Sequence, residues 1–497
     1  MTDAAMSEHE VRGEHRLLID GALVESGAGG SFDNVDPATE VVLGQTSDGT
    51  AADMHRAIAA ARRAFDDTAW STDHELRRRC LEQLHAAVSA HKEELRAITV
   101  AEVGSPIALT YANQVDLPID DLGYWVEQPV RYEYEHWLPP RDVFGQPQRR
   151  LVRREAVGVV GAITPWNFPL NLNLAKLGPA LAAGNTVVLK PAPDTPWSAT
   201  ALGRMIAEET DIPAGVVNVV ASSDHMVGEV LTTDPRVDMI TFTGSTATGR
   251  RIMAKGSDTV KKVFLELGGK SANIVLDDVA DPAGAIGVSA IGVCTHAGQG
   301  CAITTRLLLP RSRYEEFLEV ADTMMGSVTY GDPWDMANLQ GPLISAKQLG
   351  RVMGYIEKGK AEGARLVRGG GRPAHLGKGF FVEPTLFADV DPKATIAQEE
   401  IFGPVLAVIP YEDDDDAVRI ANDSIYGLSG AVTSASEERA MAVARRVRTG
   451  TLMVNGGFWN APDVPFGGYR QSGVGRENGA EGFEEYLEVK AIALPAR

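Results

Sequence analysis

Short runs of β-branched and aliphatic residues alternate with helix-forming stretches through the middle of the chain. The runs are Val157–Ile163, Thr186–Lys190, Val216–Val220, Met239–Thr243, Val263–Leu265 and Asn273–Leu276. Helical patterns lie between them near Pro196–Glu209, His225–Thr232 and Thr246–Lys255. Strands that are apolar along their whole length are typical of parallel sheets covered by helices on both faces. We therefore expect an open, parallel α/β sheet that binds its ligand at the carboxyl ends of its strands.

A similar alternation follows in the C-terminal half. Strands are expected at Ile303–Leu309, Ala407–Pro410, Leu428–Thr433 and Thr451–Asn455, and helices at Tyr314–Met325, Asp414–Ala421 and Glu437–Arg446. Gly268-Gly269 separates the two series and lets the chain turn freely. Residues 128–150 fit neither series because they are rich in proline, arginine and aromatic residues. The sequence thus predicts one α/β domain from residues 1–127 and 151–267, a second from 268–478, and a small module from 128–150 and 479–497.

Charge and cysteine content exclude several classes of protein. The formal net charge is −20, whereas nucleic-acid binders carry basic patches. The three cysteines, Cys80, Cys294 and Cys301, are too few for a disulfide scaffold and fit a reducing cytosol. The start Met1–Glu14 has no apolar core typical of a secretory signal, and no apolar run approaches the roughly 20 residues that span a bilayer. We expect a cytoplasmic protein with no nucleic-acid or membrane partner.

A thiol stands beside flexible glycines in Gly298-Gln-Gly-Cys301. The thiolate is the reactive form of cysteine, and glycine allows a substrate to approach the sulfur closely. Taken alone, the motif also fits an inert buried cysteine. A zinc site formed by Cys294, His296 and Cys301 is disfavoured because the spacing and a fourth ligand are missing, so no metal is expected.

Three further motifs lie at the ends of predicted strands. Glu266 stands among apolar residues, where burial would raise its pKa into the range of a general base, although a salt-bridged structural carboxylate is equally possible. Asn167 follows a strand and could donate to an oxyanion or merely form a turn. The segment Phe242–Gly249 opens a helix whose backbone N–H groups could bind phosphate. It is not a P-loop, because Arg250-Arg251 replaces the required Lys-Ser/Thr.

These motifs occur in an order that resembles the aldehyde dehydrogenase superfamily over nearly the whole chain. The matching strings are Pro165-Trp-Asn-Phe-Pro169, Lys190-Pro-Ala192, Phe242-Thr-Gly-Ser-Thr246, Leu265-Glu-Leu-Gly-Gly-Lys270, Gly298-Gln-Gly-Cys301, Glu399-Glu-Ile-Phe-Gly-Pro404 and Pro465-Phe-Gly-Gly-Tyr-Arg-Gln-Ser-Gly473. The resemblance implies a Rossmann-like dinucleotide-binding first domain, a catalytic second domain and a small β module for oligomerisation. It also implies a homodimer or homotetramer.

The same resemblance implies an aldehyde oxidation through a cysteine thiohemiacetal and a hydrolysed thioester. Cys301 matches the nucleophile, and Asn167 the side chain that holds the oxyanion. Glu266 matches the base that activates water. Lys176 and Glu477 match a proton-relay pair.

Other positions match residues that contact the cofactor. Lys190 matches the residue that binds the adenine-side ribose, and Glu400 the residue that holds the nicotinamide-side ribose. Gly244 and Ser245 match the pyrophosphate-binding helix start. Further cofactor contacts are implied for Phe402, Trp166 and Gly268.

Two departures from the family pattern concern the cofactor. Ser222 and Asp224 stand where many members have glycines, and Pro193 stands where NAD-preferring members often have a glutamate. We still expect NAD, with NADP as the alternative, because Lys190 has no obvious cationic neighbour for a 2′-phosphate.

The substrate and the rival functions follow from the same residues. Channel positions implied by the resemblance are mostly apolar (Phe168, Leu172, Thr295, Phe458 and Trp459), which favours an uncharged aliphatic or aromatic aldehyde. A CoA-acylating dehydrogenase, a non-catalytic structural protein of the same fold, and a cofactor-free hydrolase using His296 are the alternatives. Glu266 argues against the first, because CoA-acylating relatives generally lack this base.

Overall fold

The computed structural model describes residues 10–496, so residues 1–9 of the predicted polar start, and residue 497, lie outside the described residues. Its first domain is built on an eight-stranded sheet. From edge to edge the strands are β19 (Gly473–Val474), β11 (Lys262–Glu266), β10 (Met239–Thr243), β7 (Val159–Ile163), β8 (Thr186–Lys190), β9 (Val217–Val219), β1 (Leu17–Ile19) and β2 (Ala22–Val24). The strands from β11 to β9 are parallel, and antiparallel strands close both edges.

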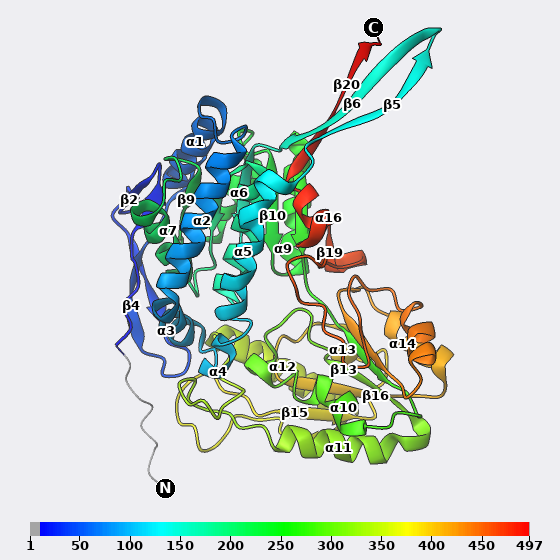
Figure 1. Cartoon of the computed structure of the whole chain (residues 1–497). Coiled ribbons are helices and arrows are strands. Elements are labelled where there is room, and N and C mark those ends of the chain that lie inside the picture. Colours follow the sequence, from blue (N-terminus) through cyan, green and yellow to red (C-terminus); the bar gives the residue numbers. More distant parts are fainter. Residues whose placement is uncertain (1–9, 497) are drawn as a thin grey trace.

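Helices cover both faces of this sheet, as the uniformly apolar strands predict (Figure 1). Successive residues of β8 enter two separate cores: Val188 packs with Met54 of α1 (Ala51–Asp67), and Val187 with Leu81 of α2 (His74–Ala90). The other helices of this half are α3 (Lys92–Val103), α4 (Ile107–Thr110), α5 (Asp116–Arg131), α6 (Pro169–Ala183), α7 (Trp197–Glu209), α8 (His225–Thr233) and α9 (Thr246–Gly256). A separate hairpin is formed by β3 (Ser31–Val35) and β4 (Val42–Ser47).

The second domain has a seven-stranded sheet that is parallel except at β14. Its order is β14 (Arg365–Arg368), β15 (Thr385–Ala388), β16 (Val405–Tyr411), β13 (Arg306–Pro310), β12 (Ala272–Val275), β17 (Gly430–Thr433) and β18 (Met453–Val454). Its helices are α10 (Pro282–Ala290), α11 (Tyr314–Gly326), α12 (Ala346–Ala361), α13 (Thr395–Gln398), α14 (Asp414–Asn422) and α15 (Glu437–Ala444). The predicted α/β fold class is confirmed. The domain limits stay a prediction, and β19, which lies in the range 268–478 expected for the second domain, pairs in the sheet of the first.

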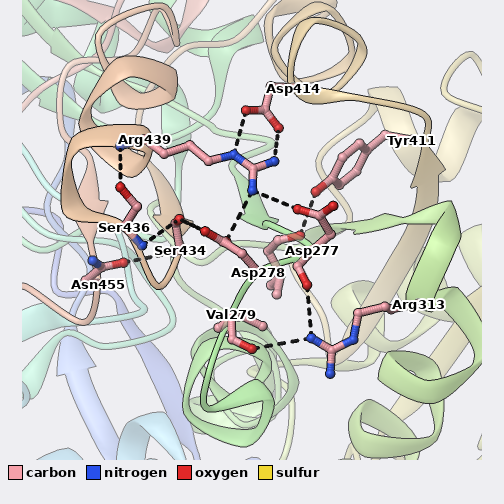
Figure 2. Close-up of polar contacts among 11 residues, drawn as sticks. Asp277, Asp278, Val279, Arg313, Tyr411, Asp414, Ser434, Ser436, Arg439 and Asn455 are labelled. Carbon is pink, nitrogen blue, oxygen red and sulfur yellow. Dashed lines mark hydrogen bonds and ion pairs between the residues drawn. The ribbon is translucent and has the colours of Figure 1, made fainter.

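A polar cluster links elements of this second domain at the carboxyl ends of its inner strands (Figure 2). Arg439 of α15 donates two hydrogen bonds to Asp414 at the start of α14, of 2.9 and 2.7 Å. It donates a third, of 2.7 Å, to Asp277 just after β12. One guanidinium thereby links two helices to the end of a central strand.

A third, three-stranded sheet joins the two segments predicted for the small module. It consists of β5 (Glu135–Val143), β6 (Gln146–Ala156) and β20 (Leu487–Pro495), and it projects away from the rest of the chain in Figure 1. α5 extends to Arg131, and Phe483 of α16 (Gly479–Glu484) packs into the first core, so both segments begin against the first domain. Short 3₁₀ helices are η1 (Ser257–Thr259), η2 (Thr295–Gly298), η3 (Arg311–Arg313) and η4 (Arg470–Ser472). No helix in the described part of the chain is long and apolar enough to cross a membrane.

Candidate active site

Cys301 follows a sharply bent loop that lies between the two domains. His296, Ala297 and Gly298 have φ values of 52°, 52° and 71°, so three consecutive residues adopt left-handed backbone conformations. A Cβ at Gly269 would lie 2.5 Å from the Cys301 carbonyl oxygen, so only glycine allows the domain link to pack against this loop. Cys301 is half-buried, whereas Cys80 and Cys294 are buried. The predicted nucleophile is thus the most accessible of the three thiols.

The side chain of Gln299 anchors the loop that carries this thiol. Its Oε1 accepts a hydrogen bond of 2.9 Å from the Ile344 amide, and its Nε2 lies 3.2 Å from the carbonyl oxygens of both His296 and Pro342. Gln299 lies within the motif Gly298–Cys301, which did not identify a role for it. The structure shows that it fixes the loop to the segment between α11 and α12.

Asn167 lies against the same loop, at the turn that leads into α6. Its side chain is buried, and its Nδ2 donates a 2.8 Å hydrogen bond to the backbone oxygen of Gln299. A primary amide nitrogen carries two hydrogens, so one remains for an oxyanion. Its backbone oxygen accepts a 2.9 Å hydrogen bond from Gln114, a residue that no sequence motif identified.

Glu266 is the last residue of β11 and is held by strands on both sides. It pairs with Thr243 of β10 and with Gly473 of β19, and its side chain is 1% exposed. Burial raises the pKa of the Glu266 carboxyl well above its ordinary value, and the charge of Glu477 raises it further. This is the state expected of a general base that works near neutral pH.

The pKa of the Cys301 thiol is also raised well above its ordinary value. Burial is the main cause, followed by the negative charges of Glu266 and Glu400. The thiol is therefore protonated in this arrangement, and a base must take its proton before it can attack. Glu266, whose charge acts on the thiol and whose buried Oε1 has no hydrogen-bond partner in the part of the chain that the structure describes, is the candidate for this base.

Lys176 and Glu477, the predicted relay pair, form an ion pair behind Glu266. Both side chains are buried, and the Lys176 ammonium lies 4.4 Å from the centre of the Phe264 ring. Lys176 lowers the pKa of Glu266, and Glu477 raises it. The structure thus brings Cys301, Glu266, Lys176 and Glu477 into one connected group.

Residues predicted to contact the nicotinamide side of a cofactor meet next to this group. Glu400 accepts a 2.9 Å hydrogen bond from the Gly269 amide, and a Cβ at Gly268 would come within 2.5 Å of its carboxylate. The Trp166 and Phe402 rings pack edge to face with centroids 5.4 Å apart. Of these residues, Glu400 lies near enough to the thiol for its charge to raise the pKa of Cys301.

The adenine-side residues lie at the ends of neighbouring strands. The Lys190 ammonium has only two long hydrogen bonds, of 3.3 and 3.4 Å, to the Pro191 and Ser222 carbonyl oxygens, which leaves it able to donate to a ribose. Burial lowers the pKa of Lys190 to about 8. Asp224, one of the two departures, accepts from the Met226 amide at 2.8 Å and caps α8.

The predicted pyrophosphate site is at the start of α9. Ser245 is the N-cap residue, and its hydroxyl accepts from the Thr248 amide at 3.2 Å. The amide of Gly244 already donates to the Glu266 carbonyl oxygen at 3.0 Å, so a phosphate would have to use the amides beyond it. The helix start itself has the geometry that favours phosphate.

Aromatic side chains that the resemblance assigns to the substrate channel pack against neighbouring rings. Phe458 and Trp459 stack with ring centroids 6.1 Å apart, and the ring centroids of Phe168 and His296 lie 5.3 Å apart. His296 is 1% exposed, and burial lowers the pKa of its ring to about 4. A neutral imidazole packed on a phenyl ring gives no support to a cysteine hydrolase. Among the described residues there is no group of His, Cys, Asp and Glu side chains that could hold a metal ion.

Comparisons with known proteins agree with this geometry. A model of the aldehyde dehydrogenase family matches residues 23–492. A 3-succinoylsemialdehyde-pyridine dehydrogenase from a Pseudomonas species is 42% identical over 490 residues, which are 97% of this chain and 99% of the relative.

Solved structures are similar over almost the whole chain. An aldehyde dehydrogenase of Mycobacterium tuberculosis complexed with NAD+ has a TM-score of 0.93 at 42% identity, covering 98% of this chain and 99% of that one. A mutant of aldehyde dehydrogenase C from Pseudomonas syringae, complexed with NAD+ and octanal, has a TM-score of 0.91 at 39% identity, covering 98% of both chains.

Proposed function

This chain belongs to the aldehyde dehydrogenase family and oxidises an aldehyde with hydride transfer to a nicotinamide cofactor; on that premise, we propose how its residues divide the reaction. Cys301 is the nucleophile, Glu266 the base, and Asn167 the side-chain donor to the oxyanion. The observation that carries this assignment is a buried Glu266 carboxyl, with no hydrogen-bond partner for its Oε1 among the residues described, near enough to the half-buried Cys301 thiol for the two groups to raise or lower each other's pKa.

The first half of the reaction joins the sulfur to the aldehyde. Glu266 takes the proton of the Cys301 thiol, and the thiolate forms a bond to the carbonyl carbon. The electron pair of the carbonyl moves to its oxygen, which accepts hydrogen bonds from Asn167 Nδ2 and the Cys301 amide. Such prepositioned donors are among the largest contributions to catalysis of acyl chemistry.

The second half breaks the carbon–sulfur bond again. When bound, the cofactor would supply the acceptor for the hydride of the tetrahedral carbon, and Cys301 would then hold the acyl group as a thioester. Glu266 first passes the proton of the Cys301 thiol to the Lys176–Glu477 pair and is ionised again. It then takes a proton from water, which attacks the thioester, and returns this proton to the departing sulfur, so that a carboxylic acid and the thiol are released.

The residues at both ends of the cofactor site fit NAD. Lys190 and Glu400 are placed to bind the two riboses, and Ser245 begins the helix that meets the phosphates. NAD is preferred over NADP because the Lys190 ammonium has the carboxylates Asp194 and Asp224 nearby, which would repel a 2′-phosphate. The NAD+ complexes of the similar structures support this choice.

The substrate is an uncharged aliphatic or aromatic aldehyde. The aromatic residues Phe168, Phe458 and Trp459 support this, as does the octanal bound to the P. syringae relative. A panel of hexanal, benzaldehyde and a semialdehyde carboxylate, run with NAD and then with NADP, tests both choices. A preference for NADP or for the carboxylate would contradict them.

The alternative functions predict different properties of the same site. A CoA-acylating enzyme would need CoA for steady turnover, whereas Glu266 supplies a base for hydrolysis. A purely structural protein would have no need of the Cys301–Glu266 contact. The exposed three-stranded sheet supports a homodimer or homotetramer, and the three free cysteines support a cytoplasmic location.

One pair of variants tests the division of roles. Cys301→Ala abolishes oxidation but retains cofactor binding, measured by fluorescence titration. Glu266→Gln slows formation of the acyl-enzyme and blocks its hydrolysis, so reduced cofactor appears in one slow burst without sustained turnover. Full steady-state activity of Glu266→Gln would show that another group is the base.

A further inference from the structure

We infer that Gln114 is a positioning residue for the oxyanion site, acting through its hydrogen bond to the backbone of Asn167. This rests on the proposed role of Asn167 as an oxyanion donor. Gln114 lies just before α5 and outside every motif of the sequence, 53 residues before Asn167.

The contact is buried and directional. The Gln114 side chain is 0% exposed, and its Nε2 donates to the Asn167 carbonyl oxygen at 2.9 Å. On its other side, Asn167 donates from Nδ2 to the Gln299 carbonyl oxygen at 2.8 Å. Gln114 therefore holds the backbone of Asn167, and the loop that contains Gln299 holds its side chain.

This clamp decides where the remaining hydrogen of Asn167 Nδ2 points. An amide group is planar, so fixing one N–H towards Gln299 leaves a single direction for the other. The Gln299 carbonyl cannot shift easily, because the side chain of Gln299 is anchored at Ile344, His296 and Pro342. The one remaining freedom is movement of the Asn167 backbone, and the hydrogen bond from Gln114 restrains it.

Within the described residues, the side chain of Gln114 makes one polar contact, the hydrogen bond from its Nε2 to Asn167. Its Oε1 is buried and has no hydrogen-bond partner. A buried acceptor without a partner destabilises a fold, so an apolar side chain of equal size would suit a purely packing role better. The hydrogen bond to Asn167 gives the glutamine a function that such a side chain would lack.

Gln114→Met removes the donor and keeps the volume. We expect kcat for aldehyde oxidation to fall about tenfold, since loss of an oxyanion donor costs 100- to 1000-fold and displacement costs less. The cofactor dissociation constant should stay unchanged. Gln340→Met is the matched control, because Gln340 is also fully buried, donates to a backbone oxygen (Val382) and has an unpartnered Oε1. Its kcat should change less than twofold.

Alkylation of Cys301 by iodoacetamide separates positioning from general damage to the loop. Substitution at this reagent's carbon develops no oxyanion, so Gln114→Met should react at the wild-type rate. The same reagent counts intact sites, and kcat is expressed per alkylated thiol, which corrects for any fraction of the variant that misfolds. A parallel fall in alkylation and oxidation, or an equal loss in Gln340→Met, would overturn the inference.

A double-mutant cycle completes the test. If Gln114 acts through Asn167, Gln114→Met has no further effect on kcat in an Asn167→Ala background. Additive losses would overturn the inference while leaving the proposed function in place. Full activity of Asn167→Ala alone would instead refute the proposed oxyanion role, so the two failures are distinguishable.

Discussion

At the scale of single residues, burial raises the pKa of Glu266, and two buried neighbours of opposite sign then shift this pKa in opposite directions. Lys176 lowers its pKa and Glu477 raises it. The base acts in its ionised form, so the rate of deacylation rises with pH through the pKa of Glu266. Lys176→Met should move this rise to higher pH, and Glu477→Gln should move it to lower pH.

The measurement is the pH dependence of acyl-enzyme hydrolysis in each variant, followed after a single burst of cofactor reduction. Unchanged cofactor affinity in both variants serves as the control. Shifts in the same direction would show that the pair acts by shape and not by charge.

At the scale of secondary-structure elements, Arg439 is predicted to stabilise the second domain (Figure 2). Its removal leaves Asp277, Asp278 and Asp414 facing one another without a cation. Arg439→Met should lower the free energy of unfolding by about 1–2 kcal/mol, allowing for partial exposure of the group. Denaturant unfolding measures this loss of stability, and high salt should reduce the difference between the variant and the wild type by screening the carboxylates.

Arg419→Met, which removes an exposed pair with Asp416, should change stability by under about 1 kcal/mol. Equal losses of unfolding free energy in the two variants would contradict the predicted stabilising role of Arg439.

The elements that the sequence predicted are those with a local signal. Buried strands such as β8 and β10 are continuous apolar runs, and their ranges agree with the expected ones. β19 has only two residues, Gly473 and Val474, and its place beside β11 depends on a pairing across about half the chain. No periodicity could reveal that pairing.

The site shows the same division. Cys301, Glu266 and Asn167 stand in short motifs, so the resemblance could identify them. Gln114 and the anchoring bonds of Gln299 depend on which backbone oxygens come near in the folded chain, and a single sequence does not encode this locally. The raised pKa of the thiol was also beyond sequence reasoning, because it depends on burial next to Glu266 and Glu400.

At the scale of the whole molecule, the three-stranded sheet is predicted to hold subunits together. Val489 and Ile492 of β20 are exposed, as is Phe144 at the turn between β5 and β6. All three belong to one small projecting sheet, and exposed apolar surface of this kind indicates an interaction site. Val489→Glu should reduce the mass measured by light scattering to that of a smaller assembly, while each subunit keeps its cofactor affinity. Val41→Glu, at an equally exposed valine near the N-terminal hairpin, should not change the mass. An unaltered mass for Val489→Glu would show that assembly uses another surface.

The pairing of β19 with β11 also has a consequence for how the protein is made. The first half of the chain leaves the ribosome well before residues 473 and 474, and until they arrive the strand that ends in Glu266 has a bare edge. Unpaired strand edges invite pairing with other chains. A nascent or truncated polypeptide therefore exposes an aggregation-prone strand edge next to Glu266. This edge is paired only after the C-terminal part of the chain has been translated.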